Sequence, residues 1–172
     1  MNQRRIITTA IYDSPVGPLL LGEFDGRLCL CDWTEAPRHA RLLTRLEDSL
    51  GATAVGGVSA CLENARGQLD EYFAGQRQSF SIPLSLNGTD FQKQVWSALS
   101  AIPCGATESY LGIARLMQKS SAVRAVAGAI GSNPLSIIIP CHRVIAADGS
   151  LTGYRGGLEA KRFLLNLENP NL

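Results

Sequence analysis

Three consecutive residues carry the most chemistry in this sequence. Cys141, His142 and Arg143 follow Pro140 and the apolar run 137–139. An imidazole and a guanidinium beside a thiol favour its ionised form, and the thiolate is the nucleophilic form of cysteine. The pattern therefore indicates a reactive cysteine at position 141. A buried structural cysteine is the alternative, because cysteine is common in protein cores.

His142 needs a partner that orients its ring if it is to act as a base. The side chains of adjacent residues usually diverge, so we expect a proton to pass from Cys141 to His142 through a water molecule rather than directly. The orienting group should be a carboxylate of the second half of the chain. Glu168 is the leading candidate, and its competitors Asp148 and Glu159 are expected to be solvated.

The other histidine and the other cysteines show no comparable pattern. His39 lies among arginines and is expected on an exposed helix face without a chemical role. Cys29 and Cys31 alternate along one predicted strand, and Cys61 and His39 do not complete a familiar zinc spacing, so we expect no metal site. Cys104 has no ionisable residue close to it in the sequence and is expected to be structural. No glycine fingerprint for a nucleotide is present, so we expect no cofactor.

The first half of the chain has the pattern of an α+β domain. Residues 19–24 and 27–33 flank Asp25-Gly26, a preferred two-residue turn, and predict a β-hairpin. Apolar residues at helical spacing predict two helices. They are Leu42, Leu43, Leu46 and Leu50 in the first helix, and Cys61, Ala65, Leu69, Tyr72 and Phe73 in the second. Gly75 is a candidate C-cap, and residues 79–88 have the composition of a connector.

The second half contains the outline of a helix-turn-helix. Residues 110–117 and 122–130 predict two short helices separated by a polar turn, with Ser120 or Ser121 as the cap of the second. That second helix carries Arg124 alone among small residues. Small side chains permit close approach to a sugar-phosphate backbone or a shallow groove, with the arginine as a wedge. A tightly packed core helix is the alternative.

Elements on either side of this pair complete the second half. Thr89 and Gln92 have the spacing of a capping box at the start of a helix that ends before Pro103. Residues 136–140 are expected to be extended, and Asp148-Gly149 predicts a turn. A last helix should pack on the core through Ala160, Phe163, Leu164 and Leu167.

Composition and charge limit the class of protein. The 172 residues are 45% hydrophobic and 18% charged, as in an ordinary globular protein. No apolar run approaches the roughly 18 residues that span a bilayer. Residues 1–5 precede no signal-like apolar segment, and five irregularly spaced cysteines suit a reducing compartment, so we expect a cytoplasmic location. Residues 87–172 hold eight basic and five acidic residues, against eight and ten before them, so a polyanion would bind the second half.

The motifs together resemble one family. The segment 138–145 is similar to the active-site signature of the 6-O-alkylguanine-DNA alkyltransferases, also called methylated-DNA–protein-cysteine methyltransferases. Other motifs resemble that family in order and spacing across most of the chain. They are Ser14-Pro15-x-Gly17, Leu69-x-x-Tyr72-Phe73, Phe91-Gln92-x-x-Val95-Trp96, Ile102-Pro103-Cys104-Gly105, Ser109-Tyr110, Val123-Arg124-Ala125-Val126, Gly131-Ser132-Asn133-Pro134, Thr152-Gly153-Tyr154 and Lys161-x-x-Leu164-Leu165-x-x-Glu168.

The resemblance implies an α+β fold in two domains. Residues 1–86 would form a small sheet-plus-helix, ribonuclease H-like domain with a connector. Residues 87–172 would form a helical, winged-helix-like domain whose helix-turn-helix binds DNA in the minor groove. The partner would be double-stranded DNA containing alkylated guanine, without cofactor, metal or membrane, and the protein would be a monomer. It would flip the damaged guanine out and accept its alkyl group irreversibly, once per molecule.

The resemblance also implies a role for individual residues. Cys141 would accept the alkyl group, His142 would be a water-mediated base, and Glu168 would orient it. Asn133 would brace the active-site turn, and Tyr110 would hydrogen-bond the base and stabilise guanine as it leaves. The DNA-contacting residues would be Arg124, which fills the gap in the duplex, Ala125, Ser121, Ala122 and Ala129. The base pocket would comprise Tyr110, Val144, Tyr154, Arg155 and Gly156.

Two departures from the family pattern bear on the range of substrates and on the affinity for DNA, and not on the reaction itself. The turn 118–121 lacks the glycine or proline often found there, and Arg155 stands where a small residue is common. Two other functions compete with alkyl transfer, namely a non-catalytic alkyltransferase-like lesion binder and a hydrolase built on Cys141. The sequence leaves open the range of alkyl groups and whether 4-O-methylthymine is accepted.

Overall fold

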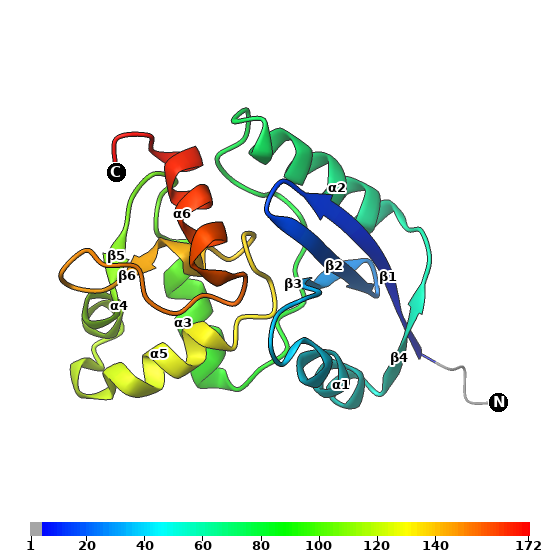
Figure 1. Cartoon of the computed structure of the whole chain (residues 1–172). Helices are drawn as coiled ribbons and strands as arrows, with labels where there is room; N and C mark the ends of the chain where they lie inside the picture. The colour runs from blue at the N-terminus through cyan, green and yellow to red at the C-terminus, as the bar shows by residue number, and fades with distance from the viewer. Residues whose placement is uncertain (1–4) are drawn as a thin grey trace. The chain divides into compact units, whose positions relative to one another are not determined.

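The computed structural model describes residues 5–172 (Figure 1). Residues 1–4, which belong to the N-terminal stretch expected to carry no secretion signal, lie outside the described residues. The chain divides into two compact units, one ending at Asn87 and the other beginning at Gly88. A sheet flanked by two helices forms the first unit, and the second is mainly helical, so the predicted α+β class is confirmed. Within the described residues, no helix is long and apolar enough to cross a bilayer.

The first unit is built on a four-stranded sheet. Its strands are β1 (Arg5–Ser14), β2 (Gly17–Phe24), β3 (Arg27–Trp33) and β4 (Ala52–Gly56), in the order β3-β2-β1-β4. The first three strands are antiparallel neighbours, and β4 runs parallel to β1. The predicted hairpin is confirmed: Asp25 and Gly26 both have positive φ (51° and 75°), as the tight turn between β2 and β3 requires.

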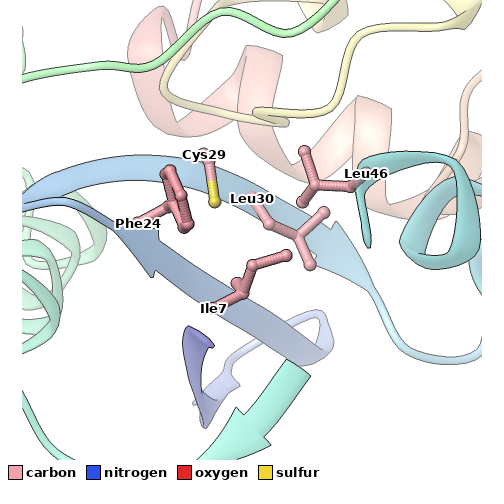
Figure 2. Packing of buried hydrophobic residues seen from close by; sticks show 5 residues of the cluster. All are labelled: Ile7, Phe24, Cys29, Leu30 and Leu46. Atoms are coloured by element: carbon pink, nitrogen blue, oxygen red, sulfur yellow. The ribbon is translucent and has the colours of Figure 1, made fainter. Parts of the chain in front are cut away.

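Two helices, α1 (His39–Leu50) and α2 (Ala60–Phe73), cover opposite faces of this sheet. Ile7 of β1 lies in a buried cluster with Leu46 of α1 (Figure 2). The side chain of Tyr12, on the same strand, points to the opposite face of the sheet, where its hydroxyl donates to Asp70 of α2 at 2.8 Å. Alternation along a strand requires this division of odd and even positions.

Both edge strands of the sheet, β3 and β4, have part of their outer edge hydrogen-bonded to other parts of the chain. The connector covers β3, because the Leu28 N–H donates to the Pro83 carbonyl and the Leu28 carbonyl accepts from the Ser85 N–H, both at 2.9 Å. On β4, the Ala54 N–H donates to the Glu47 carboxylate of α1 at 2.8 Å. A side chain therefore takes one of the edge donors that another strand would otherwise bind.

The second unit packs helices around a very short sheet. Its helices are α3 (Asp90–Ser100), α4 (Tyr110–Leu116), α5 (Val123–Gly131) and α6 (Gly157–Glu168), with one-turn 3-10 helices η1 (Ser120–Ala122) and η2 (Cys141–Arg143). The strands β5 (Glu108–Ser109) and β6 (Val144–Ile145) pair in parallel. The predicted capping box of Thr89 and Gln92 is confirmed. The indole N–H of Trp96 donates to the Ala129 carbonyl at 2.9 Å and joins α3 to α5.

Three local predictions are wrong. No serine side chain caps α5, because Ser120 and Ser121 belong to the 3-10 turn η1 that leads into the helix. The segment expected to be extended is a tight turn, closed by a hydrogen bond from the Ile139 N–H to the Leu135 carbonyl at 2.8 Å. The last helix is rotated from its predicted register, because Phe163 is exposed and the buried face carries Ala160, Lys161, Leu164 and Leu165.

Candidate active site

Cys141 follows directly after a tight turn that Asn133 organises. The Asn133 amide donates to the Ile139 carbonyl at 2.9 Å, and its oxygen accepts from the Leu135 N–H at 2.9 Å. Ile137, a β-branched residue, has a left-handed backbone conformation in this turn (φ 71°). Such strain costs on the order of 1–3 kcal/mol and persists only where the surrounding structure imposes it. The backbone that carries the thiol is therefore held by specific contacts.

His142 and Arg143 share one buried carboxylate. Nε2 of His142 lies 2.7 Å from Oε1 of Glu168. Arg143 donates from Nε to Oε2 at 2.8 Å and from Nη2 to Oε1 at 2.9 Å. A further bond from Nη1 to the Ile102 carbonyl, at 2.6 Å, fixes the guanidinium. The predicted orienting carboxylate thus lies against the imidazole, at the end of α6.

The surroundings set the protonation of this cluster. Burial raises the pKa of Glu168, but the hydrogen bonds from His142 and Arg143 and the charge of Arg143 outweigh it and hold that pKa well below its ordinary range. Burial lowers the pKa of His142, so its ring is neutral at pH 7. A carboxylate only accepts, so Nε2 carries the hydrogen and Nδ1 is the acceptor. Among the described residues, Nδ1 has no hydrogen-bond partner.

The thiol of Cys141 is protonated at rest. Burial raises its pKa, and a hydrogen bond from Asn133 together with the charges of Lys161 and Arg155 only partly offsets that effect. The prediction that neighbouring basic groups favour the thiolate is therefore wrong for the free protein. Desolvation outweighs them, and the adjacent guanidinium is engaged by Glu168. A nucleophilic role for Cys141 would therefore require a base that receives the thiol proton.

Lys161 belongs to this site, although the sequence analysis gave it no role. Its side chain is fully buried, and Nζ donates to the carbonyls of Val144 at 2.6 Å and Thr152 at 2.9 Å. Val144 lies in β6, and Thr152 lies in the loop that joins β6 to α6. Burial lowers the pKa of Lys161. Its spacing from Leu164, Leu165 and Glu168 is the signal that could have placed it on the inner face of α6.

The pairing of β5 with β6 brings Tyr110 toward the reactive segment. Tyr110 begins α4 directly after β5, and β6 follows directly after η2. The Tyr110 hydroxyl lies 3.4 Å from the Thr152 carbonyl oxygen and 3.4 Å from its Oγ1. Sequence reasoning missed Thr152 because its contact with Tyr110 joins residues 42 positions apart.

The other predicted base-pocket residues lie in β6 and before α6. Val144 is fully buried. The ring of Tyr154 lies edge-on to the His142 imidazole, with centroids 6.5 Å apart and an interplanar angle of 74°. Arg155 and Gly156 are partly exposed, directly before α6.

The predicted DNA-contacting residues divide between two faces. Arg124, Ala125 and Ser121 are exposed, and Ala122 is half-buried. Ala129 is buried against α3, with only 4% of its surface exposed. It lies on the inner face of α5, so its proposed contact with DNA is wrong.

Outside this cluster, the prediction for His39 is wrong. His39 is not on an exposed face, because its side chain is 16% exposed and Nδ1 lies 2.7 Å from Oδ2 of the buried Asp32. For Cys104 the structural role stays a prediction; in the fold, the charges of Glu168 and Arg143 act on its thiol, whose pKa burial raises. Both contacts join residues that are separated in sequence and meet only in the fold.

The competitors of Glu168 lie on the surface. Asp148 is exposed and accepts from the N–H and the hydroxyl of Ser150 at 2.9 and 2.6 Å, and Glu159 is exposed in the first turn of α6. Within residues 5–172, no group of three or more His, Cys, Asp or Glu side chains is placed to hold a metal ion.

Family comparisons match both units of this chain. The ribonuclease-like domain of 6-O-methylguanine DNA methyltransferases matches residues 7–86, and their DNA-binding domain matches residues 90–170. The chain belongs to the 6-O-methylguanine-DNA methyltransferase family. The family predicted from the motifs is thereby confirmed.

The alignments with similar proteins cover most of this chain and most of each relative. A methylated-DNA–protein-cysteine methyltransferase of Methanosarcina barkeri is 45% identical over 162 residues, which cover 94% of this chain and 97% of the relative. One of Mycobacterium tuberculosis is 45% identical over 159 residues, with 91% and 88% covered. The crystal structure of M. tuberculosis OGT in complex with DNA has a TM-score of 0.79 and 42% identity, with 96% of this chain and 93% of that chain covered.

Proposed function

We propose that this protein repairs DNA by moving the methyl group of 6-O-methylguanine to Sγ of Cys141. The observation that carries the proposal is the arrangement of His142, the residue directly after Cys141, whose Nε2 is engaged by Glu168 while Nδ1 remains an acceptor. Its relatives are named methylated-DNA–protein-cysteine methyltransferases, and a similar protein has been crystallised with DNA. The substrate is double-stranded DNA that carries an alkylated guanine.

The target base has to leave the helix before the sulfur can reach it. Extrusion of a base costs a few kcal/mol, and less for a mispaired lesion, which supplies part of the selectivity. Arg124, exposed on α5 among small residues, occupies the space that the base leaves. Ala125, Ser121 and Ala122 let α5 approach the DNA backbone closely. Val144, Tyr154, Arg155 and Gly156 surround the extruded base.

Transfer is an in-line displacement at the methyl carbon. The thiol proton passes through water to Nδ1 of His142, the bond from Sγ to carbon forms, and the bond from carbon to O6 breaks with its electron pair left on guanine. Glu168 orients the imidazole and stabilises its charged form, Asn133 holds the turn, and Tyr110 donates to the departing base. The thioether has no route back, so each molecule reacts once. One copy therefore acts on one lesion, and we expect the protein to be a monomer.

The non-catalytic lesion binder is not favoured, because such proteins lack the reactive cysteine and the relatives are named methyltransferases. A hydrolase on Cys141 is disfavoured by the same family assignment.

Intact-protein mass spectrometry tests this function. The protein is incubated with excess duplex DNA that contains one 6-O-methylguanine, and a digest locates the modification. We expect one added methyl per molecule, on Cys141, and no second turnover. Cys141→Ala should gain no methyl but still bind the lesion, whereas Cys104→Ala, the control for a second thiol of the same unit, should be methylated. An unchanged mass would support a binder, and catalytic cycling would contradict the proposal.

A further inference from the structure

Tyr110 and Thr152 are joined by contacts that alkyl transfer as described above does not use. The phenol oxygen lies 3.4 Å from both oxygens of Thr152, its carbonyl and Oγ1. An O–H···O bond is usually about 2.7–2.8 Å long, but hydrogen bonds of catalytic groups are often longer before substrate binds. The phenol has one hydrogen to donate. Of its two neighbours, the carbonyl can only accept, whereas the threonine hydroxyl can also donate.

The carbonyl of Thr152 is the poorer acceptor for the Tyr110 hydrogen. It already accepts a bond of 2.9 Å from Nζ of Lys161, whose side chain is fully buried. A cation bonded to an oxygen reduces the negative potential that a second donor meets. The same ammonium donates to the Val144 carbonyl at 2.6 Å, so Lys161 also fixes the position of Thr152 relative to β6. The backbone of Thr152 is thus anchored to α6 and β6, and its Oγ1 lies 3.4 Å from the phenol oxygen.

A hydrogen bond donated to the phenol oxygen makes Tyr110 a better donor to the departing guanine. When Tyr110 gives its hydrogen to the departing guanine, negative charge develops on the phenol oxygen. A hydrogen bond donated to that oxygen stabilises the developing charge, and bonds to charged groups are about twice as strong as neutral ones. The Thr152 hydroxyl can donate this bond, because its Oγ1 lies 3.4 Å from the Tyr110 oxygen.

We infer that Thr152 is a positioning residue for alkyl transfer, whose hydroxyl orients the Tyr110 phenol and donates to its oxygen. This inference rests on the proposed function and on the role of Tyr110 in it. As the bond from Sγ to carbon forms and the bond from carbon to O6 breaks, the electron pair stays on guanine and the thiol proton goes to His142. Tyr110 shares its hydrogen with guanine, and Thr152 shares its own with Tyr110. No group is oxidised or reduced, and only the thiol of Cys141 is consumed.

Thr152→Val tests the inference, because it removes the hydroxyl and keeps the shape and the backbone carbonyl. Single-turnover methyl transfer from 6-O-methylguanine duplex should slow by about ten-fold, the factor expected from losing one bond to a charged oxygen. The Kd for the lesion should change less than two-fold. Thr152→Ser should restore most of the rate. In a Tyr110→Phe background, Thr152→Val should have no further effect, because the oxygen it serves is absent.

Alkylation of Cys141 by iodoacetamide separates this role from a structural one. Iodide leaves without a hydrogen-bond donor, so Thr152→Val should alkylate at the wild-type rate. Ser150→Ala, which removes another hydroxyl of the same loop, is the matched control for both assays and should behave as wild type. Equal slowing in both Tyr110 backgrounds, equal slowing of both reactions, or unchanged methyl transfer would each overturn the inference. Failure of the wild-type protein itself to methylate Cys141 would instead overturn the proposed function.

Discussion

Arg143 and Glu168 form a bidentate ion pair in the interior of the second unit, with both N–O distances below 3 Å. Their side chains are 7% and 1% exposed, so the surrounding water does little to screen the pair. Removal of one member of such a pair leaves a buried charge without compensation. The free energy of unfolding that is lost in this way is larger than the net contribution of the intact pair to stability.

Glu168→Gln should therefore lower the free energy of unfolding by about 3–5 kcal/mol at pH 7, measured by urea denaturation. The pKa of Glu168 is depressed in the folded state, so its contribution is present above its ordinary value of 4.5 and is lost as pH falls. The difference between wild type and variant should shrink below that pH. Glu159→Gln, on the exposed face of the same helix, should change stability little. A loss below about 1 kcal/mol for Glu168→Gln would show that Arg143 finds another partner.

The pH dependence of methyl transfer follows from two opposite shifts. Burial lowers the pKa of His142 below 6.5 and raises that of Cys141 above 9.0. The protein therefore keeps one protonation state, thiol with neutral imidazole, across that interval. The single-turnover rate should be nearly flat between pH 6.5 and 9.0 and should fall only below it, as His142 is protonated. A rate that rises about ten-fold per pH unit in this range would mean that free thiolate, and not the His142 route, carries the reaction.

Lys161→Met should loosen the loop between β6 and α6 while keeping the length of the side chain. The carbonyls of Val144 and Thr152 both lose a buried donor, which costs roughly 1–3 kcal/mol. Amide hydrogen exchange should accelerate over residues 145–153. Iodoacetamide should also react more slowly with Cys141, because the Lys161 charge lowers the pKa of that thiol. Arg162→Met, at the exposed neighbouring position, is the control and should alter neither measurement.

The reactive segment could be predicted from sequence because its chemical groups are contiguous. Cys141, His142 and Arg143 stand in a single run, and Glu168 ends an amphipathic helix in the same half of the chain. The protonation of the thiol could not be predicted, because it depends on burial and on charges brought in by the fold. Lys161 illustrates the same limit, since a lysine in an amphipathic helix is expected on the solvent-exposed face until its hydrogen bonds to backbone carbonyls are seen.

Local turn chemistry was predictable where one conformation dominates. Asp25-Gly26 gave the hairpin, and Gly75, with φ 72°, ends α2 one position after the C-cap Ala74, where the sequence analysis had placed the cap on Gly75 itself. The strands β1 and β4 have no such signal: β1 mixes polar and apolar residues irregularly, and β4 is short with small side chains. The turn before Cys141 was also missed, because an isoleucine at positive φ is imposed by the contacts of Asn133 and not by its own preference.

Arg124→Ala should weaken lesion binding and methyl transfer together. If the side chain fills the space of the extruded base, its removal lets the base return to the stack. Because extrusion costs a few kcal/mol, lesion binding and methyl transfer should each fall on the order of ten-fold or more. Binding is measured with Cys141→Ala present, so that no methyl is consumed. Arg124→Lys separates the two roles of the side chain: a charge contact would be largely kept, whereas the filling of the gap would not. Unchanged repair by Arg124→Ala would refute the role.

Glu47→Ala should turn the outer edge of β4 into a pairing surface. Its carboxylate holds the Ala54 N–H at 2.8 Å, on a strand, Ala52–Gly56, that contains no charged residue and no proline. Exposed Val55 and Val58 lie on or beside this edge, and an unprotected neutral edge readily pairs with another strand. We expect concentration-dependent dimers of Glu47→Ala in sedimentation velocity. Glu47→Gln, whose amide oxygen still accepts from Ala54, should match wild type, and identical sedimentation of all three proteins would show that Glu47 does not protect the edge.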